Sequence, residues 1–397
     1  METARDKDVV ELCGKLIRQP SYSGQEQGVA TELRQYMEAH GFDEVITDDY
    51  GNLIGCIHGN QPGPKVLFDG HMDTVPVPDA SVWTHDPFKA DIVDGKMYGR
   101  GTSDMRGALA AMTVAASDFA ATTNKNFAGS IYVAGVVHEE CFEGVAARAI
   151  SARVKPDYVV IGEASLCNVK VGQRGRAEIV LESFGKSCHS ANPEKGINAV
   201  YKMSKAIAAL QEVEPPEHPV LGKGILELTD IKSSPYPGAS VVPDYCRVTY
   251  DRRLLVNETP ESVLAPYQAI LDKLMAEDPE ATFKLSYANG SEQCYTGNTI
   301  AADRFFPGWL YEKDADFVQA IVSELHNDGF TPEITQYNFC TNGSHYAGEA
   351  GIKTIGLGPS RENLAHTVDE YIELEQLTKV TQCYVAVMKA LLKSSKK

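Results

Sequence analysis

Histidine and carboxylate side chains gather at the ends of three apolar segments. The segments, at 65–71, 131–138 and 158–163, are continuous and rich in β-branched residues, which is typical of strands buried on both faces. In open α/β sheets, ligands bind at the carboxyl ends of such strands. The residues at or just after those ends are His71, Asp73, Glu139, Glu140 and Glu163.

Two further residues extend this set to a composition that suits divalent cations. Asp104 precedes a helix-favouring, alanine-rich stretch at 105–121, and His366 lies near the C-terminus. Imidazole and carboxylate together suit Zn²⁺ and do not require a redox metal. Three ligating carboxylates and a bridging hydroxide would balance the charge of two zinc ions and leave one carboxylate as a base. Without cations, the crowded acids would repel one another, and some would take up protons.

The elements that must position these residues predict two domains. Helices are expected at 9–18, 26–39, 314–327 and 374–392, with a strand at 353–357, around the apolar strands. From residue 177 the texture changes to alternating strands at 177–185 and 240–253, with helices at 198–212 and 260–276. We therefore expect a catalytic domain formed by 1–176 and 293–397, and an inserted α+β domain with its own antiparallel sheet at 177–292.

Composition excludes several classes of protein. The 397 residues are 43% hydrophobic and 23% charged, which is typical of a globular protein of two or three domains. A formal charge of −17 argues against nucleic acid and anionic lipid as partners, and no apolar run reaches the length of a membrane span. The charged N-terminus does not look like a secretion signal, and nine cysteines without a CxxC spacing indicate reduced thiols, so a cytoplasmic location is expected.

The order of the motifs resembles a known family across nearly the whole chain. The segments are GHMDTV at 70–75, GRGTSDMRG at 99–107, the pair Glu139 and Glu140, then Glu163, and AH at 365–366. Together they resemble the M20 family of zinc peptidases and amidohydrolases, which includes acetylornithine deacetylase, succinyl-diaminopimelate desuccinylase and glutamate carboxypeptidase. The residue pattern of 343–373 further resembles a branch described as selenium-metabolism-linked hydrolases.

The resemblance implies a ligand set for two metal ions. His71, Asp104 and Glu163 would hold one zinc ion, and Asp104, Glu140 and His366 would hold the other, with Asp104 bridging. Co²⁺ or Mn²⁺ could replace Zn²⁺, because oxygen and nitrogen ligands admit several metals.

The same resemblance assigns roles around the metals. Glu139 would be the general base, which takes a proton from the attacking water and delivers it to the leaving amine. Asp73 would accept a hydrogen bond from the ring of His71 and fix its tautomer. A cis peptide bond is expected between Asp104 and Met105.

Residues expected to contact substrate lie partly in the inserted domain. By resemblance, His189 would stabilise the oxyanion, in its own chain or across a homodimer, and Arg174 would bind a substrate carboxylate. Arg253 keeps the family's arginine, but Ser240 replaces the usual asparagine. The loop at 340–346 departs from the family's glycine-rich threonine-aspartate loop; its expected substrate-facing residues are Asn342 and Gly343.

These observations predict an α/β fold, a zinc-peptidase-like domain with a mixed sheet between helices, plus an inserted α+β lid that dimerises. The expected reaction is metal-dependent hydrolysis of an amide bond in a small N-acyl or peptidyl amino acid, with deacylation favoured. A dipeptidase or carboxypeptidase, an N-carbamoyl amino acid amidohydrolase and a catalytically silent binding protein remain alternatives.

Overall fold

The chain forms two compact units in a computed structural model that describes residues 3–393. Unit 1 comprises Met1–Gln173, Ser291–Ala301 and Leu310–Lys397, and unit 2 comprises Arg174–Gly290 and Ala302–Trp309. The division at Gln173 falls three residues before the expected boundary at 176. Unit 2 also takes up a second segment, Ala302–Trp309, which the sequence prediction placed in the catalytic domain.

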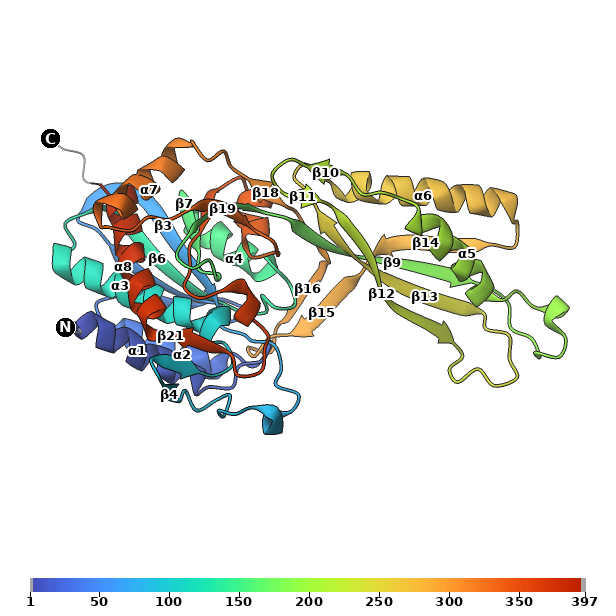
Figure 1. The fold of residues 1–397 in the computed structure, drawn as a ribbon, viewed down its shortest axis with the longest axis horizontal. Coiled ribbons are helices and arrows are strands. Elements are labelled where there is room, and N and C mark those ends of the chain that lie inside the picture. The colour runs from blue at the N-terminus through green and yellow to red at the C-terminus, as the bar shows by residue number, and fades with distance from the viewer. Residues whose placement is uncertain (1–2, 394–397) are drawn as a thin grey trace. The chain divides into compact units, whose positions relative to one another are not determined.

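Unit 1 is built on a mixed sheet, as predicted (Figure 1). Its strands follow the order β1-β2-β6-β3-β7-β20-β8-β18, with β19 paired to β8. The bounds are β1 Glu44–Thr47, β2 Leu53–His58, β3 Gln61–His71, β6 Ala128–Val136, β7 Tyr158–Ile161, β8 Val169–Gln173, β18 Trp309–Leu310, β19 Ile334–Tyr337 and β20 Lys353–Gly356. The central strands β3, β6, β7 and β20 run parallel, whereas β1, β2 and β8 add antiparallel pairings.

The parallel register brings the polar strand ends together. In β3, His71 is opposite Val136 of β6, and Asp69 is opposite Ile161 of β7. The acids that follow β6 and β7 therefore emerge at the same edge of the sheet as His71. The inner parts of β3, β6 and β7 are almost wholly buried, which accounts for their continuous apolar sequence.

Six helices of unit 1 lie around this sheet. They are α1 Ala4–Ile17, α2 Gln27–Ala39, α3 Gly107–Thr123, α4 Val145–Val154, α7 Asp316–Asn327 and α8 Leu374–Leu391. Helices α3 and α8 pack against each other and against β3, while α4 packs against β6. A small separate sheet joins β21 Tyr371–Glu373, β5 Lys96–Tyr98 and β4 Ile92–Val93.

The starts of α1 and α3 differ from the sequence prediction. Helix α1 begins at Ala4 rather than residue 9, because Thr3 and Asp6 form a reciprocal capping box that satisfies the first backbone N–H groups. The alanine-rich helix begins at Gly107, after a wider turn over Thr102–Arg106 that contains Asp104. The expected cis peptide bond at Asp104–Met105 is present.

Unit 2 is an α+β body with an antiparallel sheet of order β12-β13-β9-β14, with β17 paired to β9. Strand β13 begins at Tyr245, not at 240, since Pro243 cannot donate a ladder hydrogen bond. Helices and sheet share one apolar core. The bounds are β9 Gly175–Phe184, β10 Glu217–His218, β11 Gly222–Lys223, β12 Ile225–Ser234, β13 Tyr245–Leu254, β14 Thr282–Tyr287, β17 Phe305–Phe306, α5 Ala199–Gln211 and α6 Pro260–Glu277.

Two features bear on the compositional predictions. No helix within 3–393 is long and apolar enough to cross a membrane. All nine cysteines are free thiols in the described part of the chain, and seven of them are buried.

The two remaining strands, β15 Asn289–Gln293 and β16 Thr299–Asp303, pair with each other in a separate two-stranded sheet.

Candidate metal centre

Asp104 stands between two histidines. Its Oδ1 lies 2.9 Å from Nε2 of His71, and its Oδ2 lies 3.1 Å from Nε2 of His366. His71 ends β3 and is 1% exposed, whereas His366 comes from the loop before β21 and is 53% exposed. A carboxylate whose two oxygens face two different imidazoles has the geometry that a bridging ligand requires.

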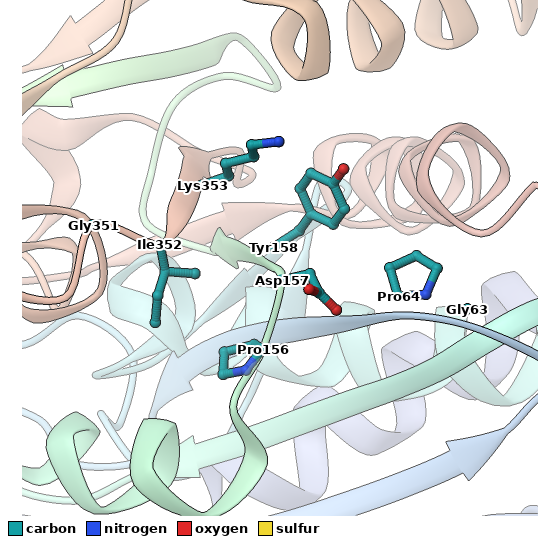
Figure 2. A pocket seen from close by; sticks show the side chains of 8 residues that line it. All are labelled: Gly63, Pro64, Pro156, Asp157, Tyr158, Gly351, Ile352 and Lys353. Carbon is teal, nitrogen blue, oxygen red and sulfur yellow. The ribbon is translucent and has the colours of Figure 1, made fainter.

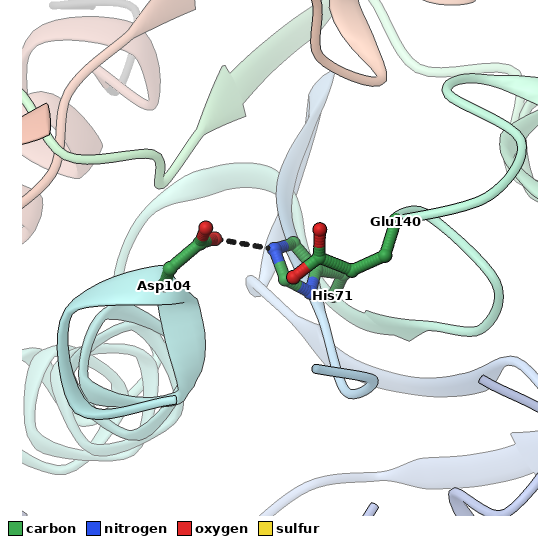
Figure 3. A group of neighbouring side chains, drawn as sticks. All are labelled: His71, Asp104 and Glu140. Atoms are coloured by element: carbon green, nitrogen blue, oxygen red, sulfur yellow. Dashed lines mark hydrogen bonds and ion pairs between the residues drawn. The ribbon is translucent and has the colours of Figure 1, made fainter. Parts of the chain in front are cut away.

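Three glutamates complete the cluster. Glu163 Oε1 lies 3.4 Å from His71 Nε2, and Glu140 Oε2 lies 3.1 Å from His366 Nε2. Candidate ligand atoms of His71, Asp104 and Glu140, drawn in Figure 3, lie within 4.8 Å of one another. The same holds for His71, Glu139 and Glu163. The structure therefore brings together all five residues predicted as metal ligands.

The cluster holds more acids than cations. No lysine or arginine in the described part of the chain forms an ion pair with Asp104, Glu139, Glu140 or Glu163. Burial raises the pKa of Glu140 to about 7, with the charge of Asp104 adding to the effect. Burial also raises the pKa of Glu163, and that of Glu139 well above its usual range. The raised pKa values show that Glu139, Glu140 and Glu163 have too little positive charge around them to stabilise their ionised forms.

The histidines respond to the same imbalance. Burial lowers the pKa of His71, but hydrogen bonds to Asp104 and Glu163 outweigh it and raise the pKa well above its usual value. The bond to Asp104, and then that to Glu140, raises the pKa of His366 to about 10. Divalent cations would supply the positive charge that these carboxylates favour, and the donor set of imidazole and carboxylate fits such cations.

The general base predicted from the sequence is buried and has an unused oxygen. Glu139 is 6% exposed, and its Oε1 has no hydrogen-bond partner among the described residues. Its Oε2 lies 4.0 Å from His71 Nε2. A buried carboxylate with a raised pKa and a free oxygen can accept and return a proton.

Asp73 acts differently from the prediction. The Nδ1 atom of His71 is held by the backbone carbonyl of Asp73 at 2.8 Å, whereas the Asp73 carboxylate is 3.6 Å away. That carboxylate instead accepts the backbone N–H groups of Glu139 and Glu140, at 3.1 and 3.2 Å. The prediction that the Asp73 side chain fixes the His71 tautomer was therefore wrong, because the chain turn after His71 presents the carbonyl to the ring.

Glu370 is a neighbour of the cluster that the sequence analysis missed. It is fully buried, and its Oε1 accepts the N–H groups of Ser103 and Asp104 at 2.8 and 3.1 Å. Its Oε2 pairs with Arg100 at 2.7 Å. The only signal in the sequence was an acid four residues after His366, which does not distinguish a buried side chain from an exposed one.

The residues predicted to contact substrate fall in both units. In unit 2, exposed His189 accepts the N–H of Ala191 on Nδ1, Arg174 donates to the carbonyl of Lys223, and Arg253 pairs with Asp251 at 2.9 Å. The predicted roles of these three residues remain predictions.

Asn342 and Gly343 are buried in unit 1. The Asn342 amide donates to Asp69 Oδ1 at 2.9 Å and accepts the N–H of Gly144 at 2.8 Å. Both ends of this amide are thus engaged within the protein, and a contact of either residue with substrate remains a prediction.

A separate pocket of about 560 Å³ lies at the other edge of the sheet (Figure 2). It is lined by residues at the amino ends of β7 and β20, including Tyr158 and Lys353. Because β3, β7 and β20 are parallel, their amino ends lie away from His71 and Glu163. This pocket is therefore distinct from the cluster.

The fold and the cluster together define a hydrolase of the metallopeptidase class, with acids and histidines at the carboxyl edge of a mixed sheet. Residues 67–390 match the model of peptidase family M20/M25/M40, and the chain belongs to this family. The protein YgeY of Escherichia coli (strain K12) is 33% identical over 395 residues, which cover 98% of this chain and 96% of YgeY. Succinyl-diaminopimelate desuccinylase of Hydrogenovibrio crunogenus is 29% identical, covering 95% of this chain and 97% of that enzyme.

Solved structures share the fold. Aminopeptidase PepT from Bacillus cereus superimposes with a TM-score of 0.74 at 23% identity, covering 97% of this chain and 98% of that chain. YXEP from Bacillus subtilis, described as a dinuclear metal binding peptidase of family M20, gives a TM-score of 0.71 at 14% identity, with 98% and 99% covered. The expected family and the mixed α/β fold are confirmed, whereas the selenium-linked branch stays a prediction.

Proposed function

We propose that this protein hydrolyses the amide bond of a small N-acyl amino acid in a reaction that depends on two divalent cations. The observation that carries the proposal is Asp104, whose two carboxylate oxygens face His71 and His366 separately. Relatives named succinyl-diaminopimelate desuccinylase, at 29% and 25% identity over almost the full chain, favour an acyl amino acid over a longer peptide.

The chain's own residues supply binding and proton transfer. His71, Asp104 and Glu163 would hold one cation, and Asp104, Glu140 and His366 the other. Bound divalent cations lower the pKa of water and polarise a carbonyl group. Zn²⁺ is the preferred occupant, and Co²⁺ or Mn²⁺ is compatible with the same ligands.

Glu139 would move the proton. Its unpartnered Oε1 accepts the proton of the attacking water and delivers it to the leaving nitrogen as the amide bond breaks. The Asp73 carboxylate holds the backbone of Glu139 and thereby limits where this side chain can point. Because Glu139 is buried, bulk water is excluded around its carboxylate, and the electrostatic interactions of that carboxylate are stronger than they would be in water.

The substrate class is tested with a panel. Protein stripped by a chelator and reloaded with Zn²⁺, Co²⁺ or Mn²⁺ is assayed on N-succinyl, N-acetyl and N-carbamoyl amino acids and on dipeptides. Metal-dependent turnover of the N-succinyl or N-acetyl compounds is the expected result. Turnover confined to dipeptides, or release of ammonia from the N-carbamoyl compounds alone, would replace the proposed substrate class.

The mechanism is tested with Glu139→Gln. We expect kcat to fall about 100- to 10,000-fold, the usual contribution of general acid–base catalysis, while both metals stay bound. Exposed Glu333→Gln serves as the control and should keep wild-type turnover. Full activity of Glu139→Gln with its metals bound would overturn the assignment of the base.

A further inference from the structure

Glu26 is a buried carboxylate that neither the fold nor the proposed reaction explains. It stands directly before α2, is 0% exposed, and makes no side-chain capping bond to that helix. No lysine or arginine forms an ion pair with it within the described chain, and its Oε2 has no hydrogen-bond partner there. Burying a charge without a partner is costly, so the position calls for a compensating role.

The other oxygen of Glu26 links two distant segments. Its Oε1 accepts the N–H of Gly24 at 2.9 Å and the N–H of His138 at 3.2 Å. Strand β6 ends at Val136, so no neighbouring strand supplies an acceptor for the N–H of His138. Glu26 thereby supplies the bond that the sheet no longer offers, directly before Glu139.

Asp73 continues the same arrangement. It accepts the next two N–H groups, those of Glu139 and Glu140, and it also accepts the hydroxyl of Ser23 at 2.7 Å. Two buried carboxylates, from segments 47 positions apart, thus hold three successive N–H groups after β6. Both also hold the Ser23–Gly24 turn, which ties that turn to the strand end.

The held segment has a backbone conformation that needs support. His138 has φ +55°, in the left-handed region that costs a non-glycine residue about 1 kcal/mol or more. Its ring is 1% exposed, so the side chain is enclosed by the protein. The Ser23–Gly24 turn, to which this segment is tied, is closely packed. A Cβ on Gly24, at φ +83°, would approach the Gln293 carbonyl oxygen to 2.6 Å.

We propose that Glu26 is a positioning residue for Glu139: by accepting the N–H of His138 it holds the left-handed turn that sends the Glu139 side chain into the metal centre. The inference rests on the proposed role of Glu139 as the base. Displacing a catalytic group by about 1 Å can cost about 100-fold in rate, so loosening this turn lowers kcat while the metal ligands stay in place.

The kinetic test compares two substitutions at position 26. Glu26→Ala removes the acceptor, and kcat should fall about 10- to 100-fold with KM changed less than about twofold and two metals still bound. Glu26→Gln keeps a carbonyl oxygen for the same two N–H groups and should recover kcat to within a few-fold of wild type. The control Asp157→Ala removes a carboxylate that accepts the N–H of Lys65 at 2.8 Å, at the opposite end of β3, and should leave kcat unchanged.

A second measurement separates this inference from the proposed function. Amide hydrogen exchange at His138 and Glu139 should accelerate in Glu26→Ala and not in Asp157→Ala, whether or not a substrate has been found. Unchanged exchange in Glu26→Ala would overturn the positioning role, and so would wild-type kcat in that variant, or a Glu26→Gln variant as slow as Glu26→Ala. Full activity of Glu139→Gln would instead sink the assignment of the base, and accelerated exchange would still show that Glu26 holds the turn.

Discussion

Two groups of acidic residues in this molecule have different partners for their negative charge. On β9 and β13 of unit 2, Glu178 and Asp251 each face an arginine: Arg176 pairs with Glu178 at 2.8 Å and with Asp251 at 3.0 Å, and Arg253 pairs with Asp251 at 2.9 Å. At the carboxyl edge of the unit 1 sheet, the carboxylates of Asp104, Glu140 and Glu163 are paired with histidines, and none of the three pairs with a lysine or arginine among the described residues.

The difference shows why charge balance is a better indicator of a metal site than acidity alone. Glu178 and Asp251 of unit 2 are about one-fifth exposed, and guanidinium groups balance their charge locally, which is a structural role. Glu139 and Glu163 are 6% and 5% exposed and have no lysine or arginine partner in the described chain. Only the second arrangement leaves negative charge that cations from outside the chain could balance.

The largest expected effect comes from removing the residue between the two histidines. Asp104→Ala should lose both metals, because each oxygen of Asp104 faces one of the two sides of the centre. Loss of several kcal/mol of metal-dependent stabilisation corresponds to at least about a 1,000-fold fall in kcat/KM. Metal content by elemental analysis and the rate are measured beside Asp8→Ala, an exposed acid of α1. Two metals per chain in Asp104→Ala would contradict the bridging role.

A smaller effect is expected from the support behind Asp104. Glu370→Gln weakens the bond to Arg100 and the acceptance of the Asp104 N–H, so metal affinity should fall about 10- to 100-fold, as for other partners of metal ligands. Competition with a chelator measures the change. Glu373→Gln, which breaks a more exposed pair with Arg361, is the matched control and should bind metal like the wild type. Equal affinities in the two variants would show that Glu370 does not support the centre.

The excess of negative charge in the cluster of acids can be tested in metal-free protein. Burial raises the pKa of Glu140 to about 7 from an ordinary value near 4.5, so the folded state holds the proton more tightly than the unfolded state. Stability is therefore lost as the pH rises from about 4.5 to 7. Glu140→Gln removes this loss and should stabilise the metal-free protein at pH 8 by at least about 1 kcal/mol, roughly one pKa unit.

Denaturant unfolding at pH 8 and pH 4.5 measures that effect. The gain from Glu140→Gln should nearly vanish at pH 4.5, where the carboxyl is protonated in the folded state and about half protonated in the unfolded state. With Zn²⁺ bound, the variant should be less stable than wild type. A destabilised metal-free variant at pH 8 would show that the acids are balanced without metals, as they are in unit 2.

The smallest effect is expected in the arginine network. Glu178→Gln removes the charge that faces Arg176 and Arg304, at 2.8 and 3.4 Å, in a partly exposed setting. The free energy of unfolding should fall by no more than about 1 kcal/mol, with metal content and kcat unchanged. A large loss of bound metal in Glu178→Gln would erase the distinction between the two groups of acids.

Much of the fold could be predicted because its signals are local. Continuous β-branched runs marked β3, β6 and β7, and helix-favouring stretches marked α2, α5 and α6 to within a residue or two. Boundaries were less certain where a side chain decides them, as the Thr3 capping box does for α1. The segment Ala302–Trp309 of unit 2 was missed, since its short strand β17 gains its identity only by pairing with β9.

The amino-acid sequence by itself determined which chemical groups stand at the strand ends and in what order. The reason is that a buried strand and the residues that end it can be recognised from a short stretch of sequence. The tertiary structure alone decided that Asp104 turns one oxygen to each histidine and that the Asp73 carboxylate accepts backbone N–H groups while its carbonyl holds the His71 ring. It also decided that Glu26 and Glu370 are buried near the centre. Those facts depend on distances between residues up to 266 positions apart, which packing sets and local patterns do not encode.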